Sequence, residues 1–294
     1  MGPRRSAPAT EFPQTPSAPR GAPRSEPLCS LAAALLAPAL FAASGAASAQ
    51  VGAADLAKQL SNPVAALISV PLQFNHDREL GPGRGGDRTT LNVQPVVPID
   101  LNADWTLISR TIVPIVTQTD AVPGGGRQSG LGDIVQSVFF SPKAPTAGGW
   151  IWGAGPVFLL PTASDDALGA KQWGAGPTAV VLKQASGWTV GALANHLWSF
   201  AGSSSRPDVS ATFVQPFVSY STPDAWTFAL NTESTYDWER ARWSVPVNVS
   251  ASKVLRIGGQ LLSIGGGLRY WIESPEGAPQ GWGFRLSLTL LFPA

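Results

Sequence analysis

The sequence predicts an all-β fold: a transmembrane antiparallel up-and-down β-barrel of twelve strands, preceded by a short N-terminal helix. Two observations predict it. From residue 64 onward the chain consists of segments of 10 to 16 residues that are bounded by Gly, Pro, Asn and Asp, with almost no helical period. An export signal precedes them and no apolar run near 18 residues follows it, so only a closed barrel would carry this chain across a membrane.

Composition narrows the class of protein. Charged residues make up 13% of the 294 residues, against about 25% in soluble domains, and the net charge is +1. A chain this close to neutral has no basic stripe that could displace counterions from a nucleic acid, so nucleic-acid partners are excluded. The length is compatible with a single domain, because all-β barrels of this size are often undivided.

The first 49 residues are predicted to be a disordered n-region plus a signal peptide. Residues 1–27 are rich in Pro, Ala, Ser and Arg and cannot bury a core. The apolar run from Leu28 to Phe41 then leads to small residues, with cleavage expected after Ala49. The signal implies export through the periplasm to the bacterial outer membrane. Because Cys29 would be removed, the mature chain would contain no cysteine.

Residues 50–63 are predicted to be a short helical segment that lies in the periplasm or plugs the lumen. Helix-forming residues over about 53–61 are followed by Asn62-Pro63, a helix stop. The barrel is expected to occupy residues 64–294.

Turns of two kinds separate the predicted strands. Short turns, such as 102–104 and 185–187, alternate with mostly longer polar loops such as 120–130. This asymmetry is typical of outer-membrane barrels, whose short turns face the periplasm, and an even strand number places both ends there. The predicted strands are 64–79, 88–101, 105–120, 131–142, 149–162, 171–184, 187–201, 208–221, 225–238, 241–254, 260–273 and 281–292.

Tryptophans mark the predicted strand ends. Four of them follow short turns, at spacings of 45, 38 and 38 residues, which corresponds to one hairpin per repeat. Trp188 and Trp198 share a face, and a strand tilted by about 45° would separate them by roughly 23 Å along the barrel axis, close to the ~25 Å apolar band of such barrels. The predicted aromatic girdles consist of Trp105, Trp150, Trp188, Trp198, Trp226, Trp243 and Trp282.

Alternation along the last strands separates a lipid-facing row from a lumen-facing row. In strand 281–292, Trp282 and Leu286 share one face and Arg285 takes the other. An Arg facing lipid near the bilayer midplane would cost about 2 to 4 kcal/mol, so the polar faces are expected to point inward. Strands four to eight alternate less cleanly, and their faces stay unassigned. The predicted lumen or substrate-path residues are Gln73, Asn75, Asn92, Gln94, Arg110, Gln118, Asn231, Glu233, Arg242, Asn248, Arg269, Glu273 and Arg285.

Motifs for catalysis, cofactors or metals are weak. The GPGRGG segment at 81–86 fits a dinucleotide-binding pattern, but a strand rather than a helix is expected after it. His196 and Ser199 would suit a Ser–His pair, but three positions apart on a strand they point to opposite faces. Asp165 and Asp166 lack further ligands for a divalent ion. We therefore predict no enzyme, no catalytic residue, no cofactor and no metal. His76 and Asp77 are interpreted as an interface position at the end of the first strand.

Several segments resemble a known bacterial family. They are NPVAALISVPLQFNHD (62–77), PIVTQTD (114–120), GLGDIVQSVFFSPK (130–143), NHLWSFAG (195–202), VQPFVSYSTPDAWTF (214–228), WSVPVNVSASKV (243–254) and FRLSLTLLFP (284–293). Over nearly all of the mature chain, they are similar to outer-membrane transporters linked to phenol-degradation (meta-cleavage) pathways, often labelled neuromedin U. The resemblance implies a barrel that passes hydrophobic or aromatic compounds and supplies no catalytic residues. One departure is the chain end, which lacks the terminal aromatic usual in barrels.

Two functions fit the sequence. The first is an outer-membrane channel or transporter for diffusion of small, hydrophobic or aromatic molecules. The second is a structural outer-membrane barrel with a plugged lumen and interacting outer loops; the inward polar residues would then be a packed network that braces it. Side chains fill the interior of an eight-stranded barrel, and a sixteen-stranded barrel leaves a water channel. A barrel of twelve strands falls between these two cases. The mixture of Arg and Glu predicts weak ion selectivity. Expected partners are the lipid bilayer, the barrel-assembly machinery and a small-molecule solute.

Overall fold

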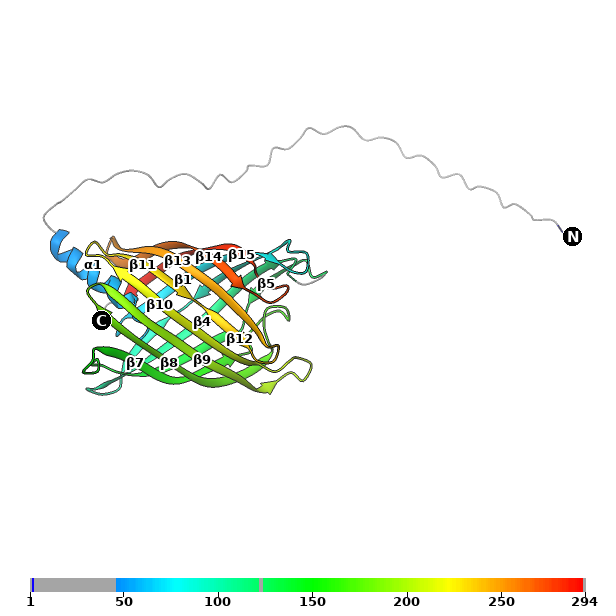
Figure 1. The fold of residues 1–294 in the computed structure, drawn as a ribbon, viewed down its shortest axis with the longest axis horizontal. Helices are drawn as coiled ribbons and strands as arrows, with labels where there is room; N and C mark the ends of the chain where they lie inside the picture. The colour runs from blue at the N-terminus through cyan, green and yellow to red at the C-terminus, as the bar shows by residue number, and fades with distance from the viewer. Residues whose placement is uncertain (1, 3–45, 122–123, 293–294) are drawn as a thin grey trace, which may run out of the picture. The chain divides into compact units, whose positions relative to one another are not determined.

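The computed structural model describes residues 2, 46–121 and 124–292. Helix α1 (Ala46–Leu60) precedes a set of tilted strands that surround a common axis (Figure 1). The strands are β1 (Ile68–Leu80), β2 (Gly86–Val93), β3 (Val96–Asp100), β4 (Trp105–Thr119), β5 (Arg127–Leu131), β6 (Ile134–Pro142), β7 (Trp150–Leu160), β8 (Gln172–Ala185), β9 (Trp188–Gly202), β10 (Ser210–Ser221), β11 (Trp226–Thr232), β12 (Ser234–Asp237), β13 (Arg242–Ile257), β14 (Gln260–Glu273) and β15 (Gly281–Phe292).

These fifteen segments form twelve barrel strands because three strands are interrupted. β2 and β3 both pair with β1 and β4, β11 and β12 both pair with β10 and β13, and β5 and β6 both pair with β4. The pairings are antiparallel, and β1 closes the barrel against β15, from Ile68 opposite Phe292 to His76 opposite Phe284. The predicted twelve-stranded up-and-down barrel with a short preceding helix is confirmed.

The start of the described chain differs from the prediction at two points. Helix α1 begins at Ala46 rather than near residue 53, because residues 46–52 are rich in alanine and also favour a helix. The first strand begins at Ile68 rather than 64, because the side chains of Val64 and Leu67 pack in buried apolar clusters instead of continuing the strand. Most of the predicted signal peptide lies outside the described residues, and the boundary at Ala49 stays a prediction.

The short turns follow from the residues in them. Ser186 and Gly187 connect β8 to β9 with φ of 50° and 83°, the left-handed pair of a two-residue type I′ turn. A Cβ on Gly187 would lie 2.7 Å from the carbonyl oxygen of Ser221, so space as well as φ requires glycine. Ile68 and Phe292 lie at the end of the barrel that carries these short turns (Figure 1). We call this the terminal end and the opposite end the loop end.

Apolar side chains cover the outside of the barrel. On β15, Trp282 and Leu286 are 60% and 54% exposed, whereas Arg285 on the other face is 8% exposed. On β9, Trp188 and Trp198 are exposed and Leu193 is buried on the inner face. The structure therefore assigns the strand faces that the sequence leaves open.

The two halves of the inner wall differ in polarity. Inward side chains of β4, β6, β8 and β9 form a buried apolar cluster with Val64, which lies between α1 and β1, and the inward side chains of β1, β2, β14 and β15 are mainly polar. Apolar residues lie on both faces of β8 and β9, which is why their sequences alternate weakly. The interior of the barrel is therefore amphipathic. The apolar cluster consists of Val64, Ile108, Phe139, Val180, Leu182 and Leu193.

Helix α1 packs against the inner wall at the terminal end. Ala57 is 1% exposed and belongs to a cluster with Leu67 and Leu291, which flank the seam between β1 and β15. Gln184 of β8 donates a hydrogen bond of 2.8 Å to the carbonyl oxygen of Lys58. Among the described residues, no helix has the length and apolarity needed to span a bilayer.

Candidate functional site

Strand alternation builds the polar half of the lumen. Asn75 of β1 lies opposite Arg285 of β15, and both are buried on the inner face. Arg269 lies on the inner face of the neighbouring strand, β14. A glycine stands opposite each arginine across the β14–β15 pair, Gly267 opposite Arg285 and Gly283 opposite Arg269. The missing side chains leave room for two guanidinium groups on adjacent strands.

Glu233 is the centre of an ion-pair network. It lies in the interruption between β11 and β12, and Arg285 donates two hydrogen bonds to its carboxylate, Nη1 to Oε1 at 3.0 Å and Nη2 to Oε2 at 2.8 Å. This bidentate contact joins β15 to the β11–β12 interruption, past β14 and β13, so it bridges part of the lumen. The Nη2 atom of Arg269 lies 3.7 Å from the same carboxylate.

A second carboxylate, that of Asp77, completes the charged cluster at the inner face of β1. The Nε1 atom of Trp271 donates a hydrogen bond of 2.9 Å to Asp77 Oδ1, and Arg269 Nε lies 3.6 Å from that oxygen. The guanidinium carbon of Arg269 lies 4.5 Å from the centre of the Trp271 ring. Arg269 is therefore held by two carboxylates and an aromatic face.

Amides connect this cluster to Arg110 on β4. Arg110 Nη2 donates to Gln94 Oε1 at 2.9 Å. Gln94 in turn donates to Gln73, and Gln73 to Asn75, each at 3.5 Å. Asn75 Oδ1 accepts a hydrogen bond of 2.7 Å from Arg285 Nε. One connected set of polar side chains therefore runs from β4 across β1 and β15 to the interruption between β11 and β12.

The charges of this region do not cancel. Arg88 on β2 joins it through a hydrogen bond of 2.9 Å from its Nε to Gln118, and Asp77 stands opposite Arg88 in the β1–β2 register. The lumen network then contains four guanidinium groups and two carboxylates, a net charge of +2. The predicted lumen set, with four arginines and two glutamates, carries the same excess of positive charge, so its charges do not balance as the prediction of weak ion selectivity assumes. A positive lumen favours anions. The six charged members are Arg88, Arg110, Arg269, Arg285, Asp77 and Glu233.

The other predicted lumen residues lie beside this network. Asn248 donates to Asn231 at 2.7 Å across β13 and β11, and Gln118 donates to Gln128 of β5 at 3.2 Å. Asn92 stands opposite Gln73 in the β1–β2 register. Arg242, like Glu273, is exposed at the loop end of its strand, so the structure does not bring these two into the network.

Sequence reasoning missed three members of the network. The sequence interpretation of Asp77 as an interface residue is wrong: it is 5% exposed and faces the lumen, because it shares the parity of Gln73 and Asn75 on β1. Trp271 shares the parity of Arg269, and Arg88 that of Asn92. Following the alternation of inward and outward residues to the loop end of each strand would have identified all three as lumen residues.

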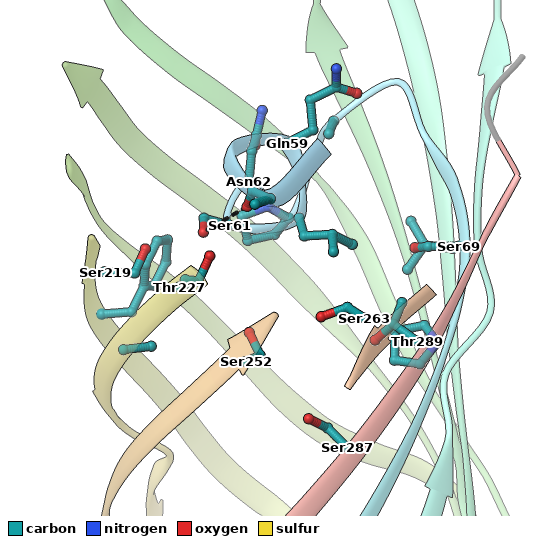
Figure 2. A pocket seen from close by; sticks show the side chains of 18 of the residues that line it. Gln59, Ser61, Asn62, Ser69, Ser219, Thr227, Ser252, Ser263, Ser287 and Thr289 are labelled. Carbon is teal, nitrogen blue, oxygen red and sulfur yellow. Dashed lines mark hydrogen bonds between the residues drawn. The ribbon is translucent and has the colours of Figure 1, made fainter. Parts of the chain in front are cut away.

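A cavity of about 330 Å³ lies between the end of α1 and the polar network. Hydroxyl groups of Thr227 and Ser252 point into it from β11 and β13, and Ser219 of β10 lines it, below the turn that carries Ser61 and Asn62 (Figure 2). Ser263, Ser287 and Thr289 extend this lining on β14 and β15, and apolar side chains from Leu60, Leu67, Val96, Phe217 and Val254 complete it. Arg110 is the one charged residue among the described residues that line the cavity. The cavity is thus a mixed pocket with hydroxyl groups, apolar surface and a single cation.

One solved structure is similar in fold to this chain, and others match it more weakly. An outer-membrane channel from Pseudomonas putida F1 is similar over 77% of this chain and 96% of its own, with a TM-score of 0.61 at 16% identity. A NanC porin matches 77% of this chain and 100% of its own, at 11% identity with a TM-score of 0.45. A FadL homologue from Pseudomonas aeruginosa matches 79% and 91%, at 10% identity with a TM-score of 0.34. No protein-family model and no curated protein matches the sequence. At 16% identity, the likeness to the Pseudomonas putida channel is one of fold.

The residues considered for catalysis have separate partners. His196 Nδ1 lies 2.7 Å from Thr212 Oγ1, and its ring lies 4.0 Å from that of Trp198 on the outer face. Ser199 faces inward and donates to Asp208 at 3.1 Å. Asp166 is paired with Lys171 in the loop before β8, which lowers the pKa of that carboxyl. None of these arrangements assembles a nucleophile with its base.

The predicted girdle tryptophans lie at both ends of the barrel. Trp105, Trp150, Trp188 and Trp226 each begin a strand after a short turn at the terminal end, and Trp198, Trp243 and Trp282 lie near the loop end. Six of the seven are at least 39% exposed, and Trp105 packs edge-on against Trp152 with ring centres 5.9 Å apart. This placement suits two aromatic belts at the borders of a bilayer.

Proposed function

We propose that the protein is a bacterial outer-membrane channel through which small molecules diffuse. It would be exported by its signal peptide, inserted by the barrel-assembly machinery and oriented with its terminal end in the periplasm. The observation that carries the proposal is the cavity between α1 and the lumen network, inside a closed barrel whose exterior is apolar. Solutes would pass along the polar half of the wall.

The nature of the solute follows from the amphipathic interior. The apolar cluster on β4, β6, β8 and β9 faces polar side chains on the opposite wall, so a molecule with an apolar body and a polar group finds a partner for each. The sequence segments resemble transporters linked to phenol degradation, and we extend the proposal to small aromatic or otherwise hydrophobic solutes. The charged network would narrow the route and orient the polar group.

The alternative is a structural barrel with a plugged lumen, and one observation favours it. Ala57 of α1 is almost fully buried against the inner wall, so the helix occupies the terminal end of the barrel. Whether the helix blocks the route or only narrows it decides between the two functions.

Solute uptake by proteoliposomes tests both. Liposomes that contain the wild-type barrel, a variant lacking residues 52–61, or no protein are mixed with small neutral, anionic and aromatic solutes, and the rates of swelling are compared. We expect the wild type to speed the uptake of small solutes and the shortened variant to speed it further. A folded wild-type barrel that transports no solute, together with a shortened variant that does, would favour the plugged structural barrel. No uptake by either folded protein would refute the channel.

A further inference from the structure

We propose that the cavity below α1 is a binding site for a small monocarboxylate with an apolar body. This inference rests on the proposed function, because it names the class of solute that the lumen holds. The cavity volume of about 330 Å³ falls at the lower end of the range of small-molecule pockets, so it fits a solute on the order of ten non-hydrogen atoms.

Arg110 supplies the contact for the carboxylate. Within the described residues, its guanidinium group makes one hydrogen bond to another side chain, from Nη2 to Gln94 at 2.9 Å. The other N–H groups of a guanidinium form a planar fork that matches the two oxygens of a carboxylate. Glu233, Arg269 and Arg285 are already engaged with each other, so Arg110 is the cation of the network that faces the cavity.

Ser219 provides an independent sign of a missing polar partner. Its side chain is buried, at 6% exposure, and its Oγ atom has no hydrogen-bond partner in the part of the chain that the structure describes. Ser219 lines the cavity beside Thr227 (Figure 2). A buried hydroxyl without a partner costs stability, and rotation of the Ser219 side chain toward the cavity would let a bound oxygen atom satisfy it. The site therefore contains a donor for which residues 46–121 and 124–292 provide no acceptor.

The apolar lining explains why the solute would also carry an apolar body. Phe217 and Val96 line the cavity and also pack against the apolar cluster of the inner wall. Leu60 and Leu67 contribute apolar surface from the side of α1. A carboxylate at Arg110 would therefore have an aromatic ring and aliphatic side chains around the rest of the molecule. An ion without such a body, such as acetate, would leave this surface uncovered.

Equilibrium binding to the purified barrel in detergent tests the site, with benzoate and benzamide as probes. The two molecules have nearly the same shape and differ in charge. We expect benzoate to bind the wild type about tenfold more tightly than benzamide, because a hydrogen bond to a charged group is worth more than one to a neutral group. Arg110→Gln should lower the affinity for benzoate about tenfold, to the level of benzamide. Arg256→Gln, the same change at an exposed position outside the cavity, should bind benzoate like the wild type.

Ser219→Ala keeps the test decisive if Arg110→Gln does not fold. We expect this variant to fold at least as stably as the wild type, because it removes an unpartnered hydroxyl, and to bind benzoate a few-fold more weakly. Equal affinity of the wild type for benzoate and benzamide would overturn the proposal, as would unchanged benzoate binding by folded Arg110→Gln and Ser219→Ala. Because binding is measured without a membrane, loss of binding with intact solute uptake refutes the site alone. Binding without uptake refutes the channel alone.

Discussion

Glu233→Gln should destabilise the barrel because it removes the charge that balances two arginines. The substitution keeps the shape of the side chain and one acceptor oxygen, but it removes the carboxylate. That carboxylate accepts hydrogen bonds of 3.0 and 2.8 Å from Arg285 and lies 3.7 Å from Arg269. Removing one partner of a buried ion pair costs about 3 to 5 kcal/mol. The Glu233 side chain is 20% exposed, so water offsets part of this, and we expect a loss of about 2 to 4 kcal/mol in the free energy of unfolding.

Urea unfolding in lipid vesicles, followed by tryptophan fluorescence, measures this loss. Glu239→Gln is the matched control, because Glu239 is exposed in the loop between β12 and β13, and its change should stay within about 0.5 kcal/mol. The double variant Glu233→Gln with Arg285→Gln should lose less than the sum of the single variants, with a coupling of about 1 to 3 kcal/mol. Unfolding of Glu233→Gln at the wild-type urea concentration would refute the role assigned to this ion pair.

Three further predictions concern the lumen, a turn and a loop. Arg269→Gln should reduce the network charge from +2 to +1, and the reversal potential under a KCl gradient in planar bilayers should then move toward cation preference; an unchanged potential would contradict the assignment of selectivity to these charges. Gly187→Ala should destabilise the barrel by about 1 to 2 kcal/mol, because the residue has φ of 83° and no room for a Cβ, whereas Gly259→Ala, where the space is open, should change the same urea titration little. Because Lys171 lowers the pKa of Asp166, their ion pair should hold the loop at neutral pH and weaken as the pH falls through that lowered pKa. The protection of amides in residues 161–171 from exchange, compared with an unstructured peptide at the same pH, should therefore fall in acid, and Lys171→Met should remove this pH dependence.

The sequence was informative where one face of a strand is polar. On β13, β14 and β15 the lumen side carries Asn248, Arg269 and Arg285 and the outer side is apolar, so alternation revealed both the strands and their orientation. On β8 and β9, Leu182 and Leu193 fill the interior while apolar residues also face outward. Two apolar faces leave no alternation to read, and those strand faces could not be assigned from sequence.

The partners within the site could be predicted less well than its members. Strand alternation alone places Arg285 and Glu233 on inward faces. Their contact passes β14 and β13, however, and no local sequence pattern predicts a contact between strands that are not neighbours. The position of Glu233 in an interruption of its strand was also not visible, because β11 and β12 read as one continuous segment. The cavity depends on where α1 packs, which is decided by contacts between residues far apart in the sequence, such as Ala57 and Leu291.

The seam between β1 and β15 sets an order of events during folding. Ile68 and Phe292 stand at opposite ends of the barrel sequence, and closing a pair so distant is slow, because the chain entropy is lost before the contacts form. The surface that holds Ala57 includes Leu67 and Leu291 on the two sides of this seam. It is therefore complete only after the last strand has joined the first, and α1 docks into a finished barrel. A nascent barrel would pass through a stage in which its lumen is formed and its helix is still outside.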